Sequence, residues 1–324
     1  MIDRRAFLLS GLALAATAAC GGDGPSPSAA PASSSSGAGY PRSVEHELGT
    51  ATLQSEPERV VCGTDGGELC SLLALGVRPV GYGKRNDPQQ PWLDGLTDGL
   101  DSYDLSGAES DFERLAIWRP DLLLVQTGFV TDENLRRYEG LAPTVATSFI
   151  DWRENLRQVG QAVGRQERAV TLEAEKDAAV AAAAARLGSR AAGFRTNWLT
   201  AFDDGSVYVL NDRSPVGKLA APLGLAPLPA QRTGGEAVEQ VSLEQLGTLD
   251  ADLLVLLHFG GSGAGRDATD ELRESAVFGT LSAARAGRVV DLDEAESEQA
   301  YFDSVLTVEP NTALLERLVT GALA

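Results

Sequence analysis

Short runs of unbroken apolar residues, separated by helical patterns, constrain the fold of this chain more than any other feature of its sequence. A strand that is buried on both faces has a continuous apolar run, and such strands are typical of parallel sheets covered by helices. The runs lie at residues 59–61, 77–82, 122–125, 144–146, 198–202, 207–210, 253–257 and 289–292. This pattern predicts an α/β fold with parallel sheets.

A short unit recurs in the two halves of the chain. In each copy a glutamate, a leucine and an aspartate precede an apolar run at identical spacing. The first copy has Glu113, Leu115 and Asp121, and the second has Glu244, Leu246 and Asp252. Matching units predict two Rossmann-like lobes, and ligands of α/β folds bind at the carboxyl ends of the strands. We therefore expect a binding cleft between the lobes.

One long helical pattern separates the two halves. Residues 166–190 are rich in Ala and Glu, and no Pro or Gly interrupts them before Gly188. The helix is either a surface helix of a single large domain or a rigid bridge between two lobes. In the second interpretation, an N-terminal α/β lobe spans 43–165, the bridging helix spans 166–190 and a C-terminal α/β lobe spans 191–324. Because a continuous helix resists hinge bending, we expect the lobes to move little relative to each other.

The first residues are typical of an export signal. Arg4 and Arg5 precede an apolar run that continues to Ala19, which is shorter than the roughly 20 residues of a membrane span. This start resembles a twin-arginine signal, and residues 17–20 resemble a bacterial lipobox with Thr17 in place of the usual Leu. We expect a signal peptide at 1–19 and a lipidated flexible tether at 20–42, rich in Gly, Ser, Pro and Ala, that begins at Cys20. The protein would then sit on the extracytoplasmic face of the cell membrane. The alternative is ordinary signal cleavage with an incidental cysteine.

Cys62 and Cys70 leave two states open. Export permits a disulfide, and Cys70 lies about one helical turn after the strand that Cys62 ends. A bridge is therefore geometrically possible, and two buried free thiols are the alternative.

Residue types needed for catalysis or for a resident metal are scarce. The two histidines, His46 and His258, lie in opposite halves and are too few for a zinc site built mainly from His and Cys. No nucleophile elbow, dinucleotide fingerprint or phosphate-binding loop is complete. The net charge of -19 argues against nucleic acid or an anionic membrane surface as a partner. We expect no catalytic residue, no metal site and no cofactor, and an exported α/β hydrolase stays a remote alternative.

Taken together, these segments resemble the helical-backbone class of ABC-transporter solute-binding proteins, which receive ferric siderophores, haem or vitamin B12. The resemblance covers about 43 to 323, and its order and spacing are more specific than any single piece. The segments that carry it are 46–50, 57–61, 73–81, 112–115, 119–122, 141–145, 241–246 and 286–290. The class has two lobes that one long helix bridges. The resemblance implies a monomer that delivers an iron chelate, most often a ferric siderophore, to an ABC importer permease.

In that class one glutamate on each lobe docks onto arginines of the permease, and the matching positions are Glu113 and Glu244. Simpler roles exist for both. Ser110 and Glu113 fit a capping box at a helix start, whereas in the second copy Ser242 pairs with Gln245 and leaves Glu244 available. The helix dipole also favours acidic residues in a first turn.

A wrapped ferric chelate satisfies the coordination of its own iron, so the resemblance implies aromatic and basic contacts rather than metal ligands. Candidates follow predicted strands in both lobes. They are Thr64, Lys84, Arg85, Thr127, Phe129 and Trp152 in the first lobe, and Phe202, Tyr208, Arg213, His258, Phe259 and Tyr301 in the second. Vitamin B12 is an alternative ligand, and haem is another, with His258 and Tyr301 as possible iron ligands. A lipoprotein that scaffolds other proteins is a further alternative.

Overall fold

The computed structural model describes residues 39–85, 90–105, 110–202, 204–228, 237–247, 250–259 and 264–324. The predicted signal peptide at 1–19 and the predicted lipidation site Cys20 lie outside these residues. The predicted tether at 20–42 overlaps them at its end, where strand β1 (Arg42–His46) begins. The Arg42 side chain donates a 2.6 Å hydrogen bond to the Gln161 carbonyl oxygen, so this end of the predicted tether packs on the N-terminal lobe.

The sheet of the N-terminal lobe is parallel throughout, as the apolar runs predict. Among the described residues its strand order is β5-β4-β3-β6-β7. The strands are β3 (Val60–Cys62), β4 (Gly81–Lys84), β5 (Ser102–Asp104), β6 (Leu122–Gln126) and β7 (Thr144–Thr147). The run at 77–82 starts as a loop because Pro79 has no N–H to donate to a strand ladder. The sheet pairs β3 with both β4 and β6, so its carboxyl ends lie along one edge.

Helices and a small hairpin surround this sheet. The helices are α1 (Gly67–Ala74), α2 (Phe112–Ile117), α3 (Asp132–Glu139) and α4 (Trp152–Ala162), with 3-10 turns η1 (Pro91–Leu93) and η2 (Thr127–Phe129). Strand β1 pairs antiparallel with β2 (Gly49–Leu53), and this hairpin packs against β7 and α4.

The sheet of the C-terminal lobe is mixed, which corrects the expectation of two parallel sheets. Its order among the described residues is β10-β9-β8-β11-β12. The strands are β8 (Thr196–Ala201), β9 (Val207–Leu210), β10 (Val238–Val241), β11 (Leu253–Leu256) and β12 (Val289–Asp291). Strand β9 runs antiparallel to both β8 and β10. Only a short connection joins β8 to β9, and such a connection permits a hairpin but not a parallel crossover.

Helices also cover the second sheet. They are α6 (Pro215–Ala220), α7 (Leu243–Leu246), α8 (Ala264–Glu274), α9 (Ser282–Arg285), α10 (Glu294–Tyr301) and α11 (Val308–Ala322), with 3-10 turns η3 (Gly188–Ala191) and η5 (Phe278–Thr280).

The repeated unit has the same structural role in both lobes. Leu115 and Leu246 are buried, each in a hydrophobic cluster of its own lobe. The Asp121 carboxylate accepts a 2.8 Å hydrogen bond from the Arg59 backbone N–H, just before β3. Asp252 accepts a 2.9 Å bond from the Arg195 backbone N–H, just before β8. Each aspartate therefore joins the start of its own strand to the start of the neighbouring one.

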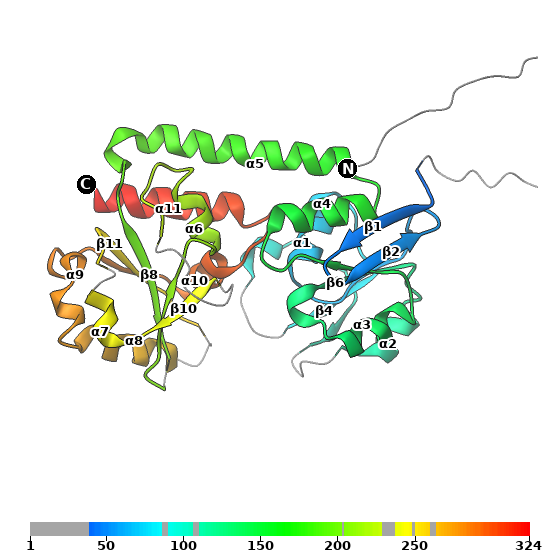
Figure 1. Ribbon diagram of the computed structural model, residues 1–324, viewed down its shortest axis with the longest axis horizontal. Helices are drawn as coiled ribbons and strands as arrows, with labels where there is room; N and C mark the ends of the chain where they lie inside the picture. The colour runs from blue at the N-terminus through cyan, green and yellow to red at the C-terminus, as the bar shows by residue number, and fades with distance from the viewer. Residues whose placement is uncertain are drawn as a thin grey trace, which may run out of the picture. The chain divides into compact units, whose positions relative to one another are not determined.

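Helix α5 (Gln166–Leu187) contacts both lobes (Figure 1). It packs on α4 of the N-terminal lobe and on α11 of the C-terminal lobe. Exposed ion pairs line these contacts, such as Arg186 with Glu316 at 2.6 Å. The helix ends at Gly188, whose φ of 62° lies in the left-handed region that glycine tolerates.

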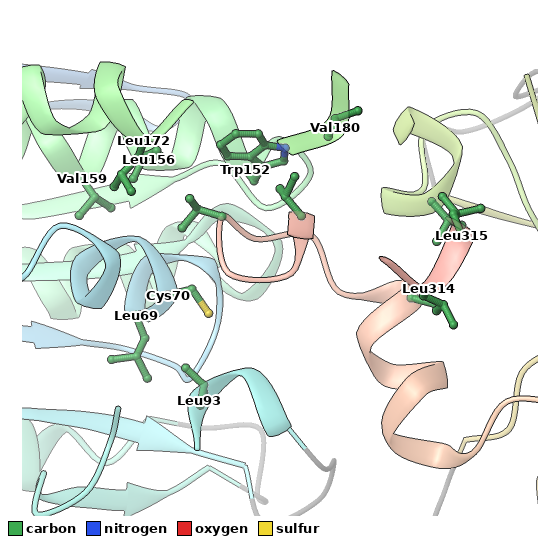
Figure 2. Packing of buried hydrophobic residues seen from close by; sticks show 14 of the residues in the cluster. Leu69, Cys70, Leu93, Trp152, Leu156, Val159, Leu172, Val180, Leu314 and Leu315 are labelled. Atoms are coloured by element: carbon green, nitrogen blue, oxygen red, sulfur yellow. The ribbon is translucent and has the colours of Figure 1, made fainter. Parts of the chain in front are cut away.

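A second connection between the lobes is the segment 302–307, which links α10 to α11. One hydrophobic cluster contains residues of both lobes, and Val305 of this segment is 0% exposed. Figure 2 shows part of the cluster, with Cys70, Leu93 and Trp152 of the N-terminal lobe and Leu314 of α11. The Phe302 ring stacks on Trp92 with ring centroids 4.9 Å apart. The chain therefore crosses between lobes in α5 and returns to contact the N-terminal lobe before α11.

Cys62 and Cys70 are free thiols in this structure, so the bridged alternative is not formed. Both are fully buried. Burial raises the pKa of the Cys70 thiol to about 12 and that of Cys62 well above its ordinary value. Because the thiolate is the reactive form, both side chains act as apolar core residues.

Candidate functional site

Three adjoining cavities form one cleft that takes side chains from both lobes, and we use the word cleft for these three together. The central cavity, of about 270 Å³, contains Arg85, Gln126, Phe129, Phe149 and Ile150 of the N-terminal lobe, and Arg213, Pro215, Ala237, Glu298, Tyr301, Phe302 and Asp303 of the C-terminal lobe. A cavity of about 520 Å³ shares Glu298 and Tyr301 with it and adds Thr200, Phe202, Asp204, Ser206, Tyr208, Leu210, Val238 and Phe259. A third, of about 250 Å³, shares Arg85 and adds Asp65, Tyr82, Lys84, Gln90, Leu93, Asp94 and Thr97.

Parallel strands position much of this lining. Arg85 follows β4, Phe149 follows β7 and Phe202 follows β8, so their side chains leave the sheets at the carboxyl edge. This is the edge at which α/β folds bind ligands.

Six of the aromatic rings that line the cleft form three edge-to-face pairs. Phe129 and Phe149 form one pair, with ring centroids 5.3 Å apart at 87°. The C-terminal lobe contributes Phe202 with Tyr208 at 5.5 Å, and Phe259 with Tyr301 at 5.8 Å. Edge-to-face pairing fixes ring orientation, so each lobe presents aromatic surface of defined shape to a ligand. Phe129 is 48% exposed, which leaves it available for contact.

The Arg85 side chain is held in place by a buried carboxylate. Asp65 is 3% exposed, and its carboxylate accepts hydrogen bonds from the Arg85 backbone N–H at 3.0 Å and from Arg85 Nε at 2.7 Å. The second contact occupies one of the five N–H donors of the guanidinium. A guanidinium that is oriented before binding can donate to ligand oxygens at a lower entropic cost.

A buried acid lies close to this pair. Glu68, on α1, is 0% exposed, and its Oε1 accepts hydrogen bonds from the Thr64 backbone N–H at 2.9 Å and the Thr64 hydroxyl at 2.6 Å. Its Oε2 has no hydrogen-bond partner among the described residues. Burial raises the pKa of Glu68 to about 7, against the hydrogen bonds from Thr64 that lower it. The protonated form is therefore well populated at neutral pH.

Eight of the twelve predicted contact residues line the cleft. They are Lys84, Arg85, Phe129, Phe202, Tyr208, Arg213, Phe259 and Tyr301. The structure thus brings residues from distant parts of the chain to one place. Their roles toward a ligand stay predictions.

The other four, Thr64, Thr127, Trp152 and His258, do not line the cleft. Thr64 is buried against Glu68. Trp152 packs in the core that the two lobes share and also lines a neighbouring cavity of about 330 Å³, which shares Pro215 and Asp303 with the central cavity. His258 is buried, and its Nε2 lies 3.1 Å from the Asp291 carboxylate. Its ring therefore lies inside the C-terminal lobe, and its role as a ligand contact or haem-iron ligand stays a prediction. These positions follow strands, but strand ends alone do not determine which way a side chain points.

Several cleft residues were not predicted. Phe149, Ile150 and Phe302 are half-exposed apolar residues in loops, and Glu298 lies on α10. Asp65 acts through Arg85, and the two are 20 residues apart. Phe149 follows the run at 144–146, so the strand-end signal was available there. The sequence has no comparable signal for Glu298.

The two glutamates predicted to dock a permease are both exposed near the starts of short helices. Helix α2 is capped by Asp111, whose side chain accepts a 2.9 Å bond from the Arg114 backbone N–H, so Glu113 takes no part in the capping box that its sequence allows. In α7 the predicted box of Ser242 with Gln245 is present. A hydrogen bond with Ser242 lowers the pKa of Glu244, which keeps this exposed carboxyl ionised. Both helices connect parallel strands, so their starts lie at the carboxyl edge of each sheet.

Among the described residues, no helix is long and apolar enough to cross a bilayer. Within the same ranges, no three His, Cys, Asp or Glu side chains are grouped in a way that would hold a metal ion.

Comparisons with known proteins agree on one kind of molecule. A family model described as "Periplasmic binding protein" matches residues 105–296. The chain is 28% identical to the iron(3+)-hydroxamate-binding protein FhuD of Bacillus subtilis, over 85% of each chain. It is 25% identical to the probable siderophore-binding lipoprotein YfiY of the same organism, over 78% of this chain and 80% of the other. A crystal structure of a periplasmic solute binding protein from Mycobacterium smegmatis has the same fold, with a TM-score of 0.73, 20% identity, and coverage of 87% of this chain and 99% of that one.

Proposed function

Because the chain belongs to the periplasmic binding protein family, we propose that it captures a ferric siderophore outside the cell membrane and delivers it to the permease of an ABC importer. The observation that carries the proposal is the cleft, in which both lobes present paired aromatic rings around a pre-oriented arginine. The names of two relatives, an iron(3+)-hydroxamate-binding protein and a probable siderophore-binding lipoprotein, support the same ligand class.

The cleft suits a ligand that brings its own iron coordination. A siderophore wraps Fe³⁺ in oxygen atoms, so the protein needs to recognise the organic shell rather than the metal. Aromatic faces pack on that shell, and the terminal nitrogens of Arg85 donate charge-assisted hydrogen bonds to the chelating oxygens. The family and the cleft both favour binding over catalysis.

Anchoring and docking complete the proposal. Lipidation of Cys20 would hold the protein at the membrane, where two relatives are named as lipoproteins. Glu113 and Glu244 would contact the permease from the carboxyl edge of each sheet, one from each lobe. Because α5 and the segment 302–307 both join the lobes, the spacing between the two glutamates would change little when ligand binds.

Tryptophan fluorescence and thermal melting test ligand capture directly. Trp92 stacks on Phe302, which lines the cleft, and ferric chelates absorb near-ultraviolet and visible light, so bound chelate should quench emission. Ligand at 100 times Kd should also add about 2.7 kcal/mol of stability. A panel of ferric hydroxamates, catecholates and carboxylates, with vitamin B12 and haem alongside, identifies the ligand class. The absence of quenching and of any melting shift with every member would refute capture of these ligands.

Arg85→Lys is the sharpest variant for this test. Lysine keeps a positive charge beside Asp65 but loses the planar fork. A lost charge-assisted hydrogen bond is about 1.5–3 kcal/mol, so the chosen ligand should bind roughly 10-fold to 150-fold more weakly. Arg190→Lys, on the exposed turn η3, is the matched control and should leave Kd unchanged. Equal affinities of the two variants would remove Arg85 from the binding role.

A further inference from the structure

The loop 148–151, between β7 and α4, forms part of the wall of the central cavity. Phe149 and Ile150 of this loop line that cavity, and their side chains are 37% and 41% exposed. A Cβ atom at Gly128 would lie 2.9 Å from the Phe149 ring, so this ring packs directly on the backbone of η2. The same ring forms the edge-to-face pair with Phe129. The position of the loop therefore determines how one aromatic pair faces a ligand.

An ion pair of the C-terminal lobe contacts the backbone at the end of this loop. Lys218 of α6 donates to the Ile150 carbonyl oxygen, and its Nζ lies 2.5 Å from the Asp303 carboxylate. Burial raises the pKa of Asp303, whereas Lys218 and a hydrogen bond from the Trp152 backbone N–H lower it. Trp152 is the first residue of α4, where a backbone N–H has no partner within the helix. The pair therefore contacts a carbonyl oxygen and an N–H group that are two residues apart in the N-terminal lobe.

Lys218 lies behind the wall of the cleft and not in it. With Trp152 it lines the neighbouring cavity of about 330 Å³, and it is absent from the described lining of the three cleft cavities. Asp303 lines both that neighbouring cavity and the central one. A ligand in the cleft therefore has no direct contact with the Lys218 ammonium. Any effect of Lys218 on affinity must pass through the loop 148–151 or through Asp303.

From these contacts, and resting on the proposed function, we infer that Lys218 is a positioning residue for the cleft: it holds the loop 148–151 so that Phe149 and Ile150 face the bound chelate. The Asp303 side chain is only 11% exposed, and low solvent exposure strengthens its attraction to the ammonium group. Without this pair the loop populates other positions, and only a fraction of the molecules has the wall in place. The apparent Kd then rises by the inverse of that fraction.

Two substitutions of Lys218 test this role by tryptophan quenching, with whichever member of the ferric hydroxamate, catecholate and carboxylate panel binds the wild-type protein. Lys218→Met keeps the length of the side chain and removes its charge and its donors. We expect its Kd to be about tenfold higher, which corresponds to about one molecule in ten with the loop in place. Lys218→Arg keeps a cation that donates to two oxygens at once, so its Kd should stay within about threefold of the wild-type value.

Two further variants separate positioning from loss of stability. Leu315 is 0% exposed on α11 and is not among the residues that line the cleft or the neighbouring cavity. Leu315→Ala should therefore lower Tm, because it leaves a cavity in the core, and should leave Kd unchanged. Phe149→Ala removes a side chain that the loop positions. In that background Lys218→Met should raise Kd much less than it does in the wild-type protein, whereas independent effects would multiply.

The outcomes distinguish this inference from the proposed function. If Lys218→Met binds the chelate as tightly as the wild-type protein, or if its penalty is undiminished in the Phe149→Ala background, the positioning role is wrong although a ferric siderophore is still captured. If Lys218→Met does not fold, the same comparison is made between Asp303→Asn and the double variant with Lys218→Met, in which no buried charge is left unpaired. If the wild-type protein binds no member of the panel, the proposed function itself fails.

Discussion

Lys218 joins the two lobes through one ammonium group, and its removal should have a pH-dependent cost. The side chain projects from α6 of the C-terminal lobe and donates to the Ile150 carbonyl oxygen of the N-terminal lobe. The same Nζ lies 2.5 Å from the Asp303 carboxylate, in the segment between α10 and α11. The Asp303 side chain is only 11% exposed, so Lys218→Met would leave a nearly buried carboxylate without its cation.

The size of the effect follows from this burial. Removing one partner of a buried ion pair costs about 3–5 kcal/mol. A third of the Lys218 side chain is exposed, at 33%, so solvent screens part of the interaction. We therefore expect a loss of about 2–3 kcal/mol at neutral pH, or roughly 4–8 °C in Tm.

The pH dependence has a definite sign. Burial raises the pKa of Asp303 more than Lys218 lowers it. At pH values between the unfolded and the folded pKa, the folded state therefore keeps a proton that the unfolded state has lost. For such a group, stability falls as pH rises from the unfolded pKa, about 4, through the raised folded pKa. Lys218→Met raises that pKa further, so the loss should be larger at pH 7.5 than near pH 4.5.

Urea unfolding at the two pH values measures these losses. Asp303→Asn removes the stranded charge, so in the Lys218→Met background it should recover most of the lost stability, and a double-mutant cycle isolates the coupling. If the loss is the same at both pH values and Asp303→Asn recovers none of it, the ion pair is not what Lys218 contributes. The lost contact with the Ile150 carbonyl oxygen would then account for most of the decrease in the free energy of unfolding.

Three further predictions concern the anchor, the docking surface and the buried acid. Cys20→Ala should release mature protein from the membrane or leave it unprocessed, which fractionation and mass spectrometry detect; wild-type protein found wholly in the soluble exported fraction would contradict lipidation. Glu113→Ala combined with Glu244→Ala should preserve Kd for the siderophore but reduce uptake by whole cells, and normal uptake would leave the two glutamates as helix-start residues only. Glu68 has a folded pKa of about 7 against an ordinary 4.5, so its ionisation lowers stability as pH rises through that window, by up to about 3 kcal/mol. Glu68→Gln should flatten the stability profile between these pH values, and an unchanged profile would mean that the carboxyl is not the titrating group.

The sequence alone determined the class of fold because a strand that is buried on both faces has a continuous apolar run. Strands such as β6 and β11 read as unbroken apolar runs, and the repeated unit identified their equivalence in the two lobes. The helix over 166–187 was readable because nothing in it breaks a helical pattern. These signals depend only on residues that are close in the sequence. They can therefore be recognised without knowing which elements each helix or strand packs against.

Contacts between distant residues were decided only in the folded chain. Strand β9 has the same apolar pattern as a parallel strand, yet a short hairpin turns it antiparallel. His258 follows a strand as Phe259 does, but its ring turns toward Asp291 and not toward the cleft. Glu298 reaches the cleft because α10 packs beside both cavities. The direction of a side chain depends on packing across the whole molecule, and no spacing along the sequence records that packing.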